Sequence, residues 1–448
     1  EMFEVPEWAA NKVVYQIFPS RFAATEPVDK ELWYKAPITP MDDLHGNLRG
    51  IIEHMDDIQN LGIDVLYMTP IFQSNSCHKY DTTDYYQIDP SFGTTEDLKE
   101  LVQKAHERGM KVVLDAVYNH TGREFFAFAD ILENGEKSKY RDWYFIDGFP
   151  LKSEWGEIPN FKCFGYYGGM PKLNLKNPEV EKYITDVACY WIKECDIDGW
   201  RLDVGDEISH FFWKNFRKAV KAVKKDMLII GEIWHYAGDF LEGDEWDTVM
   251  NYPFYLNLID LLADEKITVS QFVQNLGYLK GRLHKNCYPL MWNLIDSHDT
   301  ARFLHLCNDN KKKQHLAAAF QLLLPGMPMI YYGDEYAMPG ANDPDCRRGM
   351  YWDEEYQDKE MYEWYKRLVQ DRKGHACIVE GELAGSVTED EEGTVVLIRK
   401  NGEETIAMIF NCSSSAKKFN EYTQKYNLLT ENTFDGNVEG FDAAVIVL

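Results

Sequence analysis

The sequence predicts a closed (β/α)8 barrel of the TIM type, with an inserted domain after the third strand and a C-terminal antiparallel β-sandwich domain. Short apolar runs alternate with amphipathic helical patterns across most of the 448 residues, as expected for parallel strands joined by helices. A long aromatic segment interrupts the alternation once, and strand patterns alone follow after about residue 373. An open doubly wound sheet is the alternative arrangement for the same alternation.

The strands are predicted from apolar runs that end in polar residues. Continuous apolar sequence such as Leu228-Ile229-Ile230 is typical of strands covered on both faces. The runs span residues 13–18, 65–68, 111–117, 199–204, 227–233, 248–252, 290–295 and 329–332. Helical patterns cover 95–108, 178–194 and 207–225, and the second has proline in its first turn, where proline is favoured.

Two segments depart from the alternation. Residues 121–174 are too long for a simple loop and hold thirteen aromatic residues between positions 125 and 167, which predicts a small core, a ring-lined wall facing a ligand, or both. We therefore assign residues 1–120 and 175–372 to the barrel, 121–174 to the inserted domain, and 373–448 to the C-terminal domain.

The C-terminal domain is predicted from a hairpin signal. Strand-like runs at 395–400 and 404–410 flank Asn401-Gly402, which suits the positive φ angles of a type I′ turn. The run at 443–448 continues the β character, so an antiparallel domain is expected.

Charge and composition restrict the class of partner. The 47 Lys and Arg residues face 74 Asp and Glu, for a formal charge of −27, which argues against nucleic acid or anionic lipid as a partner. No apolar run is long enough to span a membrane. Nine cysteines without a paired spacing predict free thiols in a reducing, cytoplasmic compartment. An extracellular location is the alternative if a signal segment was removed upstream of Glu1.

The ends of four predicted strands carry dense clusters of acids and imidazoles. They read Asp115-Ala-Val-Tyr-Asn-His120, Gly199-Trp-Arg-Leu-Asp203, Gly231-Glu-Ile-Trp234 and Leu294-Ile-Asp-Ser-His-Asp299. Catalytic groups of such barrels sit at these ends, and unpaired buried carboxylates are costly, so their convergence indicates function. Ser297-His298-Asp299 resembles a hydrolase triad, but alternating strand side chains face opposite ways, which excludes that interpretation.

These blocks, taken in order, resemble the α-amylase family of glycoside hydrolases (family 13). Leu61-Gly-Ile-Asp-Val-Leu-Tyr-Met-Thr-Pro70 and Gly326-Met-Pro-Met-Ile-Tyr-Tyr-Gly-Asp-Glu335 extend the resemblance over the barrel. Met170-Pro-Lys-Leu-Asn174 is similar to the signature of the neopullulanase, cyclomaltodextrinase and maltogenic amylase group. His78-Lys-Tyr-Asp81, Gly231-Glu-Ile-Trp-His235 and Asn342-Asp-Pro-Asp-Cys-Arg347 support this narrower placement.

The resemblance implies a retaining α-glucan hydrolase and a role for each matching residue. Asp203 would be the nucleophile and Glu232 the general acid/base, with a pKa raised by burial and neighbouring carboxylates. Asp299 would favour the distorted sugar ring. The implied substrate-binding residues are Tyr80, His120, Arg201, Trp234, His298, Asp343 and Arg347; among them Arg201 would keep Asp203 ionised, and Tyr80 and Trp234 would stack on sugar rings.

Where the chain departs from the group's pattern, the expectations change. Asp206 and Ala301 stand where the group often has Asn and Glu, which affects acceptor specificity. The first barrel strand begins near Val13, without the β-sandwich module that usually precedes it, so a monomer with an open cleft is expected. Removal of that module upstream of Glu1 is the alternative. No cofactor is expected, and calcium is not favoured because residues 21–27 are poor in oxygen ligands.

The expected substrates are maltooligosaccharides, starch, pullulan or cyclodextrins, cleaved at α-1,4 bonds with some α-1,6 cleavage and transglycosylation. A glucan chain-transferring enzyme and a non-catalytic α-glucan-binding protein are the alternatives. The three intact carboxylates Asp203, Glu232 and Asp299 argue against the second of these.

Overall fold

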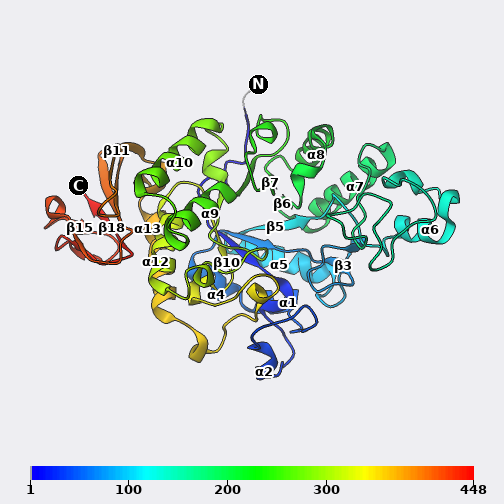
Figure 1. Cartoon of the computed structure of the whole chain (residues 1–448), viewed down its shortest axis with the longest axis horizontal. Helices are drawn as coiled ribbons and strands as arrows, with labels where there is room; N and C mark the ends of the chain where they lie inside the picture. Colours follow the sequence, from blue (N-terminus) through cyan, green and yellow to red (C-terminus); the bar gives the residue numbers. More distant parts are fainter. Residues whose placement is uncertain (1–2) are drawn as a thin grey trace. The chain divides into compact units, whose positions relative to one another are not determined.

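The structure is a computed structural model that describes residues 3–448. It contains a closed eight-stranded barrel, in the order β1-β10-β9-β8-β7-β6-β5-β2, and a C-terminal antiparallel sheet (Figure 1). The barrel strands are β1 (Val14–Ile17), β2 (Val65–Met68), β5 (Lys111–Ala116), β6 (Gly199–Leu202), β7 (Leu228–Gly231), β8 (Thr248–Asn251), β9 (Trp292–Asn293) and β10 (Met327–Tyr331). Each lies in or overlaps one predicted run, and the predicted fold class is confirmed.

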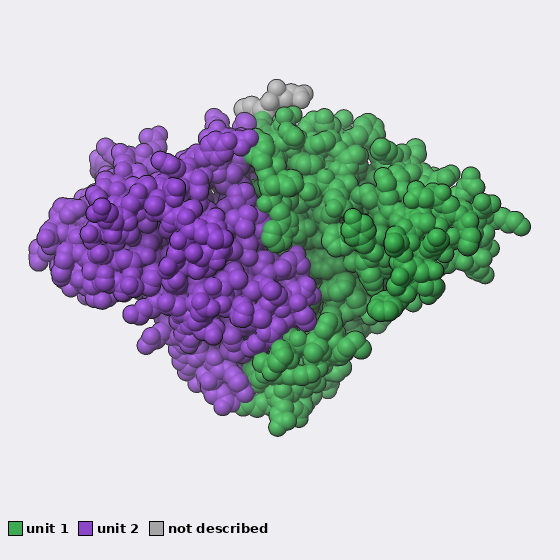
Figure 2. Space-filling view, viewed as in Figure 1, with its two compact units in different colours: residues 1–9, 16–56, 64–250 green, residues 10–15, 57–63, 251–448 purple. Residues whose placement is uncertain are grey.

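The described chain divides into two compact units (Figure 2). Of the described residues, the first unit comprises 3–9, 16–56 and 64–250, and the second comprises 10–15, 57–63 and 251–448. The first contains β2 and β5 to β8, and the second contains β9, β10 and the C-terminal sheet. The domain boundaries expected from the sequence stay a prediction.

The main helices of the first unit begin at residues whose side chains cap them. They are α5 (Thr95–Glu107), α7 (Pro178–Cys195) and α8 (His210–Val223). Thr94 and Asp97 form a capping box before α5, and the Asn177 side chain accepts a hydrogen bond from the Glu179 amide. The predicted helix at 207–225 begins later than expected because Ser209 caps α8 by accepting from the Phe212 amide.

The aromatic insertion in the first unit has both a core and exposed rings. Phe128 of α6 (Phe126–Asn134) is buried, as are Phe125 and Trp143. By contrast, Trp155 is 97% exposed and Tyr166 is 95% exposed. The segment therefore packs a satellite core and also presents flat rings to solvent.

In the second unit, helices cover the strands β9 and β10 and one face of the C-terminal sheet. They include α9 (Tyr252–Leu258), α10 (Val269–Arg282), α12 (Lys311–Leu323) and α13 (Lys359–Gly374). The Phe320 ring of α12 stacks on Phe410 of the sheet, with ring centroids 4.2 Å apart. Within residues 3–448, no helix is both long and apolar enough to cross a lipid bilayer.

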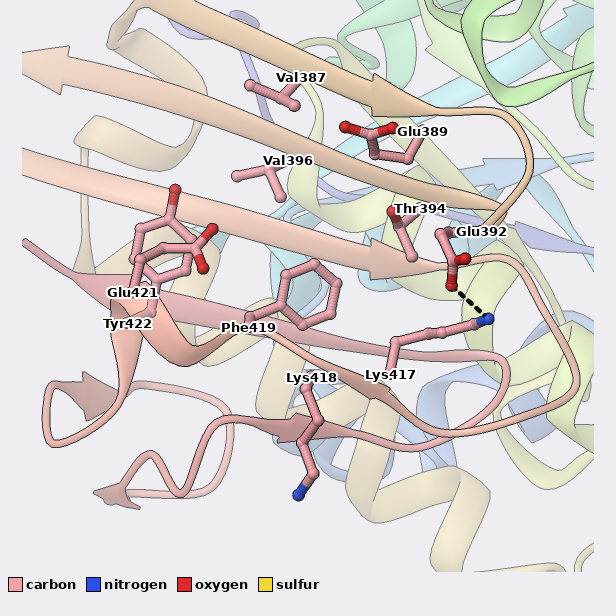
Figure 3. A pocket seen from close by; sticks show the side chains of 10 residues that line it. All are labelled: Val387, Glu389, Glu392, Thr394, Val396, Lys417, Lys418, Phe419, Glu421 and Tyr422. Carbon is pink, nitrogen blue, oxygen red and sulfur yellow. Dashed lines mark hydrogen bonds and ion pairs between the residues drawn. The ribbon is translucent and has the colours of Figure 1, made fainter.

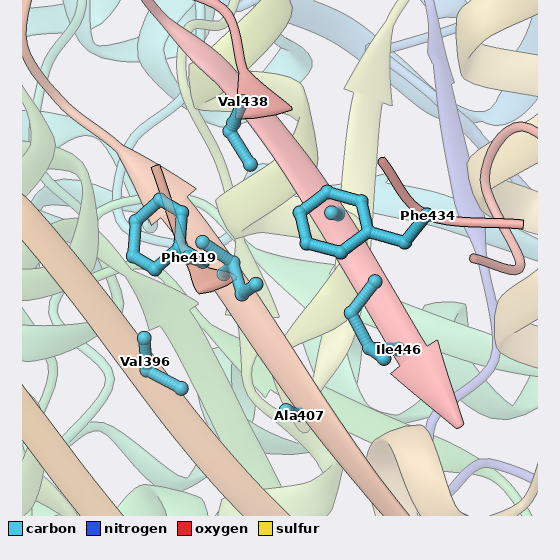
Figure 4. Packing of buried hydrophobic residues seen from close by; sticks show 8 residues of the cluster. Val396, Ala407, Phe419, Phe434, Val438 and Ile446 are labelled. Atoms are coloured by element: carbon cyan, nitrogen blue, oxygen red, sulfur yellow. The ribbon is translucent and has the colours of Figure 1, made fainter. Parts of the chain in front are cut away.

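The C-terminal sheet has the order β11-β12-β13-β18-β15-β16. Its strands are β11 (Glu382–Glu389), β12 (Thr394–Asn401), β13 (Glu404–Asn411), β15 (Tyr426–Asn427), β16 (Asn432–Thr433) and β18 (Asp442–Val447). A small second sheet pairs β14 (Lys417–Lys418) with β17 (Asn437–Val438). Phe419, Phe434 and Val438 pack with Val396 and Ile446 in a buried cluster on one face of the main sheet (Figure 4).

The predicted hairpin is present, but the predicted turn type is wrong. Asn401 pairs with Glu404, which leaves Gly402 and Glu403 as the two central residues of the turn. Gly402 has φ 62°, whereas neither Asn401 nor Glu403 has a positive φ. A two-residue turn with a positive φ only at its first central residue is type II′, which needs glycine at that position.

A buried carboxyl group in the second unit makes stability depend on pH. Glu335 is 2% exposed, and it accepts a hydrogen bond from the Gly333 amide and one from the Tyr15 hydroxyl. Burial raises its pKa from 4.5 to about 7. Between these values the folded chain keeps a proton that the unfolded chain has released, so stability falls as pH rises.

We expect Glu335→Gln to remove this pH dependence. At about 1.4 kcal/mol per pH unit, the raised pKa corresponds to roughly 3 kcal/mol. The free energy of unfolding of the variant, relative to the wild type, should rise by up to that amount between pH 4.5 and pH 8. Urea unfolding over this range measures it, with the exposed Glu360→Gln as the control. A difference that does not change with pH would contradict the assigned pKa.

Candidate active site

The centre of the candidate site in the first unit is Arg201, a fully buried arginine on β6. Its Nη1 donates to both oxygens of Asp115 at 3.2 Å and to Asp203 Oδ1 at 3.1 Å. Its Nη2 donates to Glu232 Oε2 at 2.7 Å. One guanidinium therefore holds three buried carboxylates, from the ends of β5, β6 and β7, in one place.

Asp115 is a member of this cluster that the sequence reasoning did not select as a site residue. The hydroxyls of Tyr67 and Tyr80 donate to its Oδ2 at 2.6 and 2.7 Å. Burial raises the pKa of Asp115, although Arg201 and the two tyrosines oppose the shift. Tyr67 was also missed, yet both residues lie inside sequence blocks that resemble the family, which was the available signal.

Asp203 and Glu232 are joined by a strained turn at the end of β6. Val204, the next residue, has φ 49° and ψ 39°, a left-handed conformation that is unfavourable for a β-branched side chain. In this conformation its amide donates to Glu232 Oε1 at 2.8 Å. The strained conformation of Val204 thus helps to hold the two carboxyl groups together, and backbone strain of this kind is common at functional sites.

His120 also lies in this cluster, as a neutral imidazole. Burial lowers its pKa to about 4. Its Nε2 lies 2.9 Å from the Tyr80 carbonyl oxygen, and its Nδ1 lies 3.2 Å from Asn119 Nδ2. Because a carbonyl can only accept and an amide nitrogen can only donate, Nε2 carries the proton. Its ring contacts Phe164, with centroids 5.3 Å apart, which links it to the aromatic insertion.

Trp234 lies just beyond β7 and is 42% exposed, so its ring is open to a ligand. The adjacent His235 has its Nε2 3.5 Å from Asp206 Oδ2. Burial raises the pKa of Asp206. Of the predicted residues in the first unit, the structure brings together Tyr80, His120, Arg201, Asp203 and Glu232.

The second unit gathers the other predicted residues, two of which follow β9 and two of which follow β10. Arg347 donates through Nε to the His298 carbonyl at 2.9 Å, and its Nη1 lies 3.0 Å from Asp343 Oδ1. Its Nη2 lies 3.6 Å from Asp299 Oδ1, and Asp299 Oδ2 lies 3.3 Å from His298 Nε2. His298, Asp299, Asp343 and Arg347 therefore form one charged group. How this group meets Asp203 and Glu232 stays a prediction.

Ser297, His298 and Asp299 do not form a catalytic triad, but the predicted reason, the alternation of side chains along a strand, was wrong. His298 and Asp299 are in contact because they lie in the turn beyond β9, where side chains do not alternate. The Ser297 hydroxyl instead accepts a hydrogen bond from the Asp299 amide at 3.1 Å. That contact fixes the turn, and within residues 3–448 the Ser297 hydroxyl is not hydrogen-bonded to an imidazole, as a triad needs.

A buried ion-pair network anchors the turn that carries His298 and Asp299. Asp296 Oδ2 accepts from the Phe303 amide at 3.0 Å. Arg302, fully buried, donates to Asp334 Oδ1 at 3.0 Å and to the Tyr332 carbonyl at 2.7 Å. Burial and the nearby Asp296 raise the pKa of Asp334 well above its usual value. Buried hydrogen bonds and a buried ion pair thus hold both ends of the turn.

The site therefore contains carboxylates, held by cationic side chains, that can act as general acids, general bases or nucleophiles. Among residues 3–448, no group of three or more His, Cys, Asp or Glu side chains is arranged to hold a metal ion. Two acidic groups that share one arginine can divide the roles of nucleophile and proton donor, as in retaining glycoside hydrolases.

A closed parallel barrel with paired carboxylates at its strand ends is an arrangement that glycoside hydrolases use. Residues 16–428 match the family model described as "Alpha amylase, catalytic domain", so the chain belongs to the α-amylase family. It is 46% identical over 420 residues to a cyclomaltodextrinase of Geobacillus thermopakistaniensis, covering 93% of this chain and 71% of that protein. It is 43% identical over 417 residues to neopullulanase 2 of Thermoactinomyces vulgaris, covering 92% and 71%.

A solved structure is similar over almost the whole chain. It is the cyclic α-maltosyl-(1→6)-maltose hydrolase from Arthrobacter globiformis in complex with its cyclic substrate, with a TM-score of 0.90 and 35% identity. The alignment covers 99% of this chain and 100% of that one. The placement in the neopullulanase and cyclomaltodextrinase group is therefore confirmed.

Proposed function

We propose that this chain is a retaining hydrolase of α-glucans, acting on α-1,4 bonds of maltooligosaccharides, starch, pullulan or cyclodextrins, with some α-1,6 cleavage. The observation that carries the mechanism is the shared bonding of Asp203 and Glu232 to Arg201, at 3.1 and 2.7 Å. A nucleophile and a proton donor held on one guanidinium lie close together, as direct attack on the sugar requires.

In the first step, a carboxylate oxygen of Asp203 attacks the anomeric carbon from the face opposite the leaving group. The bond from that carbon to the glycosidic oxygen breaks, and Glu232 gives its proton to the departing oxygen. The product is a β-linked ester between Asp203 and the sugar. Arg201 favours the ionised form of Asp203 that this attack needs.

In the second step, Glu232, now ionised, takes a proton from water as the water oxygen attacks the same carbon. The ester bond breaks, Asp203 is restored as a carboxylate, and the sugar leaves in the α configuration. A sugar hydroxyl in place of water gives transglycosylation. All groups in both steps belong to this chain, to the substrate or to the attacking water.

The remaining predicted residues are proposed to bind the sugars. Tyr80 and Trp234 offer rings for stacking, and the second is 42% exposed. We further propose that His298, Asp299, Asp343 and Arg347 hold sugar hydroxyls on the side of the non-reducing end, since charged side chains form strong hydrogen bonds to hydroxyl groups.

We propose a cytoplasmic location, supported by nine free cysteines, of which five are buried. Thiols of this number persist in a reducing compartment.

The proposed substrate class is tested by the products formed from maltotriose, soluble starch, pullulan and β-cyclodextrin. We expect new reducing ends from at least one of these polymers or rings, and panose from pullulan would favour neopullulanase-type cleavage. Chain disproportionation with negligible hydrolysis would replace the proposal by a glucan transferase. No change in any of the four substrates would overturn it.

A further inference from the structure

Two buried carboxyl groups of the second unit are each only half satisfied by the donors around them. They belong to Asp296, in the turn after β9, and to Asp334, beyond β10, and the two residues are 1% and 2% exposed. Asp296 Oδ2 accepts from the Phe303 amide at 3.0 Å, and Asp334 Oδ1 accepts from Arg302 Nη1 at 3.0 Å. The second oxygens, Asp296 Oδ1 and Asp334 Oδ2, are buried and reach no donor within residues 3–448.

These two oxygens are the ones left to join the carboxyl groups to each other. Asp334 makes a side-chain hydrogen bond with Asp296, yet two carboxylates can only accept, so one of them must carry a proton. Arg302 does not supply the missing donor. Its Nε and Nη2 are themselves buried without a partner in the described chain, and its guanidinium lies over the Tyr331 ring, 4.1 Å from the centroid. One proton therefore lies between Asp296 Oδ1 and Asp334 Oδ2.

The charges that face this pair favour one shared proton. Arg302 is the facing cation, and the other facing groups are Glu335 on η7 (Asp334–Tyr336), Tyr331 on β10, Tyr332, Tyr255 on α9, Gln314 on α12 and Tyr365 on α13. Burial raises the pKa of Asp334 well above its usual range, and Asp296 adds to the shift while Arg302 opposes it. Two ionised aspartates would leave an unmatched negative charge in the interior, which is costly. With one proton, the pair carries a single charge that Arg302 matches.

As a neutral acid, Asp334 bonds both ends of the turn that carries His298 and Asp299. Its Oδ1 accepts from Arg302, which follows these two residues, and its protonated Oδ2 donates to Asp296, which precedes them. A carboxylate could make only the first of these bonds, because it has no proton to donate. The proton therefore connects the end of β10 to the start of the turn.

We propose that Asp334 is a positioning residue, a neutral carboxylic acid whose proton, shared with Asp296, fixes the turn that presents His298 and Asp299 to the sugar. The proposal rests on the proposed function, because the sugar-binding role of His298 and Asp299 belongs to it. Loss of the proton sets two carboxylates against each other and releases the start of the turn, so that sugar binding weakens at alkaline pH.

Infrared spectroscopy of the chain labelled with ¹³C-aspartate tests the shared proton directly. At pH 8 Glu335, with a pKa of about 7, is mostly ionised. We expect a C=O band of a protonated carboxyl group that shifts with the aspartate label and is lost in Asp334→Asn. The exposed Asp309→Asn in the same unit is the control and should keep this band. A spectrum that loses no such band in Asp334→Asn would overturn the proposal.

Asparagine substitutions distinguish a shared proton from mere packing. In Asp334→Asn the amide oxygen can accept from Arg302 while the amide nitrogen donates to Asp296, and in Asp296→Asn the donor comes from the other side. The double variant sets two amide donors against each other and leaves Arg302 without an anion. We therefore expect its midpoint of urea unfolding to fall well below the sum of the two single effects. Additive effects would contradict a shared proton.

The pH dependence of stability counts the proton. Because the folded wild type keeps a proton on Asp334 that the unfolded chain releases, its stability should fall as pH rises from 5 to 8, relative to Asp334→Asn, with a slope equal to about one proton. Glu392→Gln is the control, because Glu392 Oε2 lies in an exposed pair with Lys417 Nζ at 2.7 Å (Figure 3), and such pairs contribute little. Equal slopes in wild type and Asp334→Asn would contradict the proposal, as would a stability that follows calcium concentration, which would assign the two oxygens to a cation.

The effect on sugar binding is measured as KM for maltotriose between pH 6 and pH 9. We expect the wild-type KM to rise about three- to tenfold over this range, the loss of one buried hydrogen bond, while the KM of Asp334→Asn stays level. Parallel KM profiles in the two chains would refute the positioning role. Hydrolysis of soluble starch without an Asp334-dependent infrared band contradicts the shared proton alone, whereas the band in a chain that hydrolyses no glucan contradicts the proposed function.

Discussion

Glu232→Gln is expected to lower turnover of maltotriose by about 10²- to 10⁴-fold, the usual contribution of a general acid/base. Glutamine keeps the size of the side chain and an oxygen that accepts from the Val204 amide. It has no proton to give to the departing oxygen and cannot take one from water. Binding of maltotriose should persist, because the neighbouring side chains are unchanged.

The leaving group distinguishes lost acid catalysis from a general disturbance of the site. An aryl maltoside with a good leaving group needs little protonation, so its first step should suffer far less than cleavage of maltotriose. Burst kinetics and steady-state rates with both substrates measure the difference. The exposed Glu207→Gln in the same unit is the matched control and should turn over near the wild-type rate. Equal loss with both substrates, or unchanged turnover in Glu232→Gln, would refute the assigned role.

Arg201→Gln is expected to have the second largest effect, on both folding and activity. The substitution leaves Asp115, Asp203 and Glu232 buried together without a cation. Breaking a buried ion pair typically lowers the free energy of unfolding by about 3–5 kcal/mol. The pKa of the stranded carboxyls should rise, so that the loss of stability is smaller at pH 5 than at pH 8. Urea unfolding at the two pH values measures the change.

Arg217→Gln provides the control, a partly buried arginine with an ion pair away from the site. Its partner Asp247 also accepts from Lys221 Nζ at 2.8 Å and from the Ile229 amide at 2.9 Å. Asp247 therefore keeps a cation and a donor, so we expect a smaller loss of stability and little change in activity per folded molecule. An Arg201 variant as stable as wild type at pH 8 would contradict the account of the cluster.

The barrel could be predicted because its strands are covered on both faces. Continuous apolar sequence such as Leu228–Gly231 has few alternatives to a buried strand. β11 could not be predicted in the same way, since Glu382–Glu389 is an edge strand whose side chains are mostly exposed. The hairpin turn type failed because the register of the two strands, and not the Asn-Gly pair, decided which residues became central.

The site was predictable where residue type and strand end coincide, as for Asp203 and Glu232. Asp115 and Tyr67 were missed because their role depends on which neighbours reach them. From sequence, a single carboxylate in a strand is usually interpreted as structural. Only the structure shows that Arg201, Tyr67 and Tyr80 all donate to Asp115. Likewise, the strain at Val204 is a backbone property that no side-chain pattern reveals.

The most direct test of the central claim, two displacements through Asp203 and Glu232, is the configuration of the first product. Proton NMR of a reducing-end-forming reaction, followed before the anomers interconvert, reports the newly formed sugar. We predict the α anomer first, with the β anomer growing only by later mutarotation. The β anomer as the first product would mean inversion by a single displacement, and would contradict the roles assigned to Asp203 and Glu232.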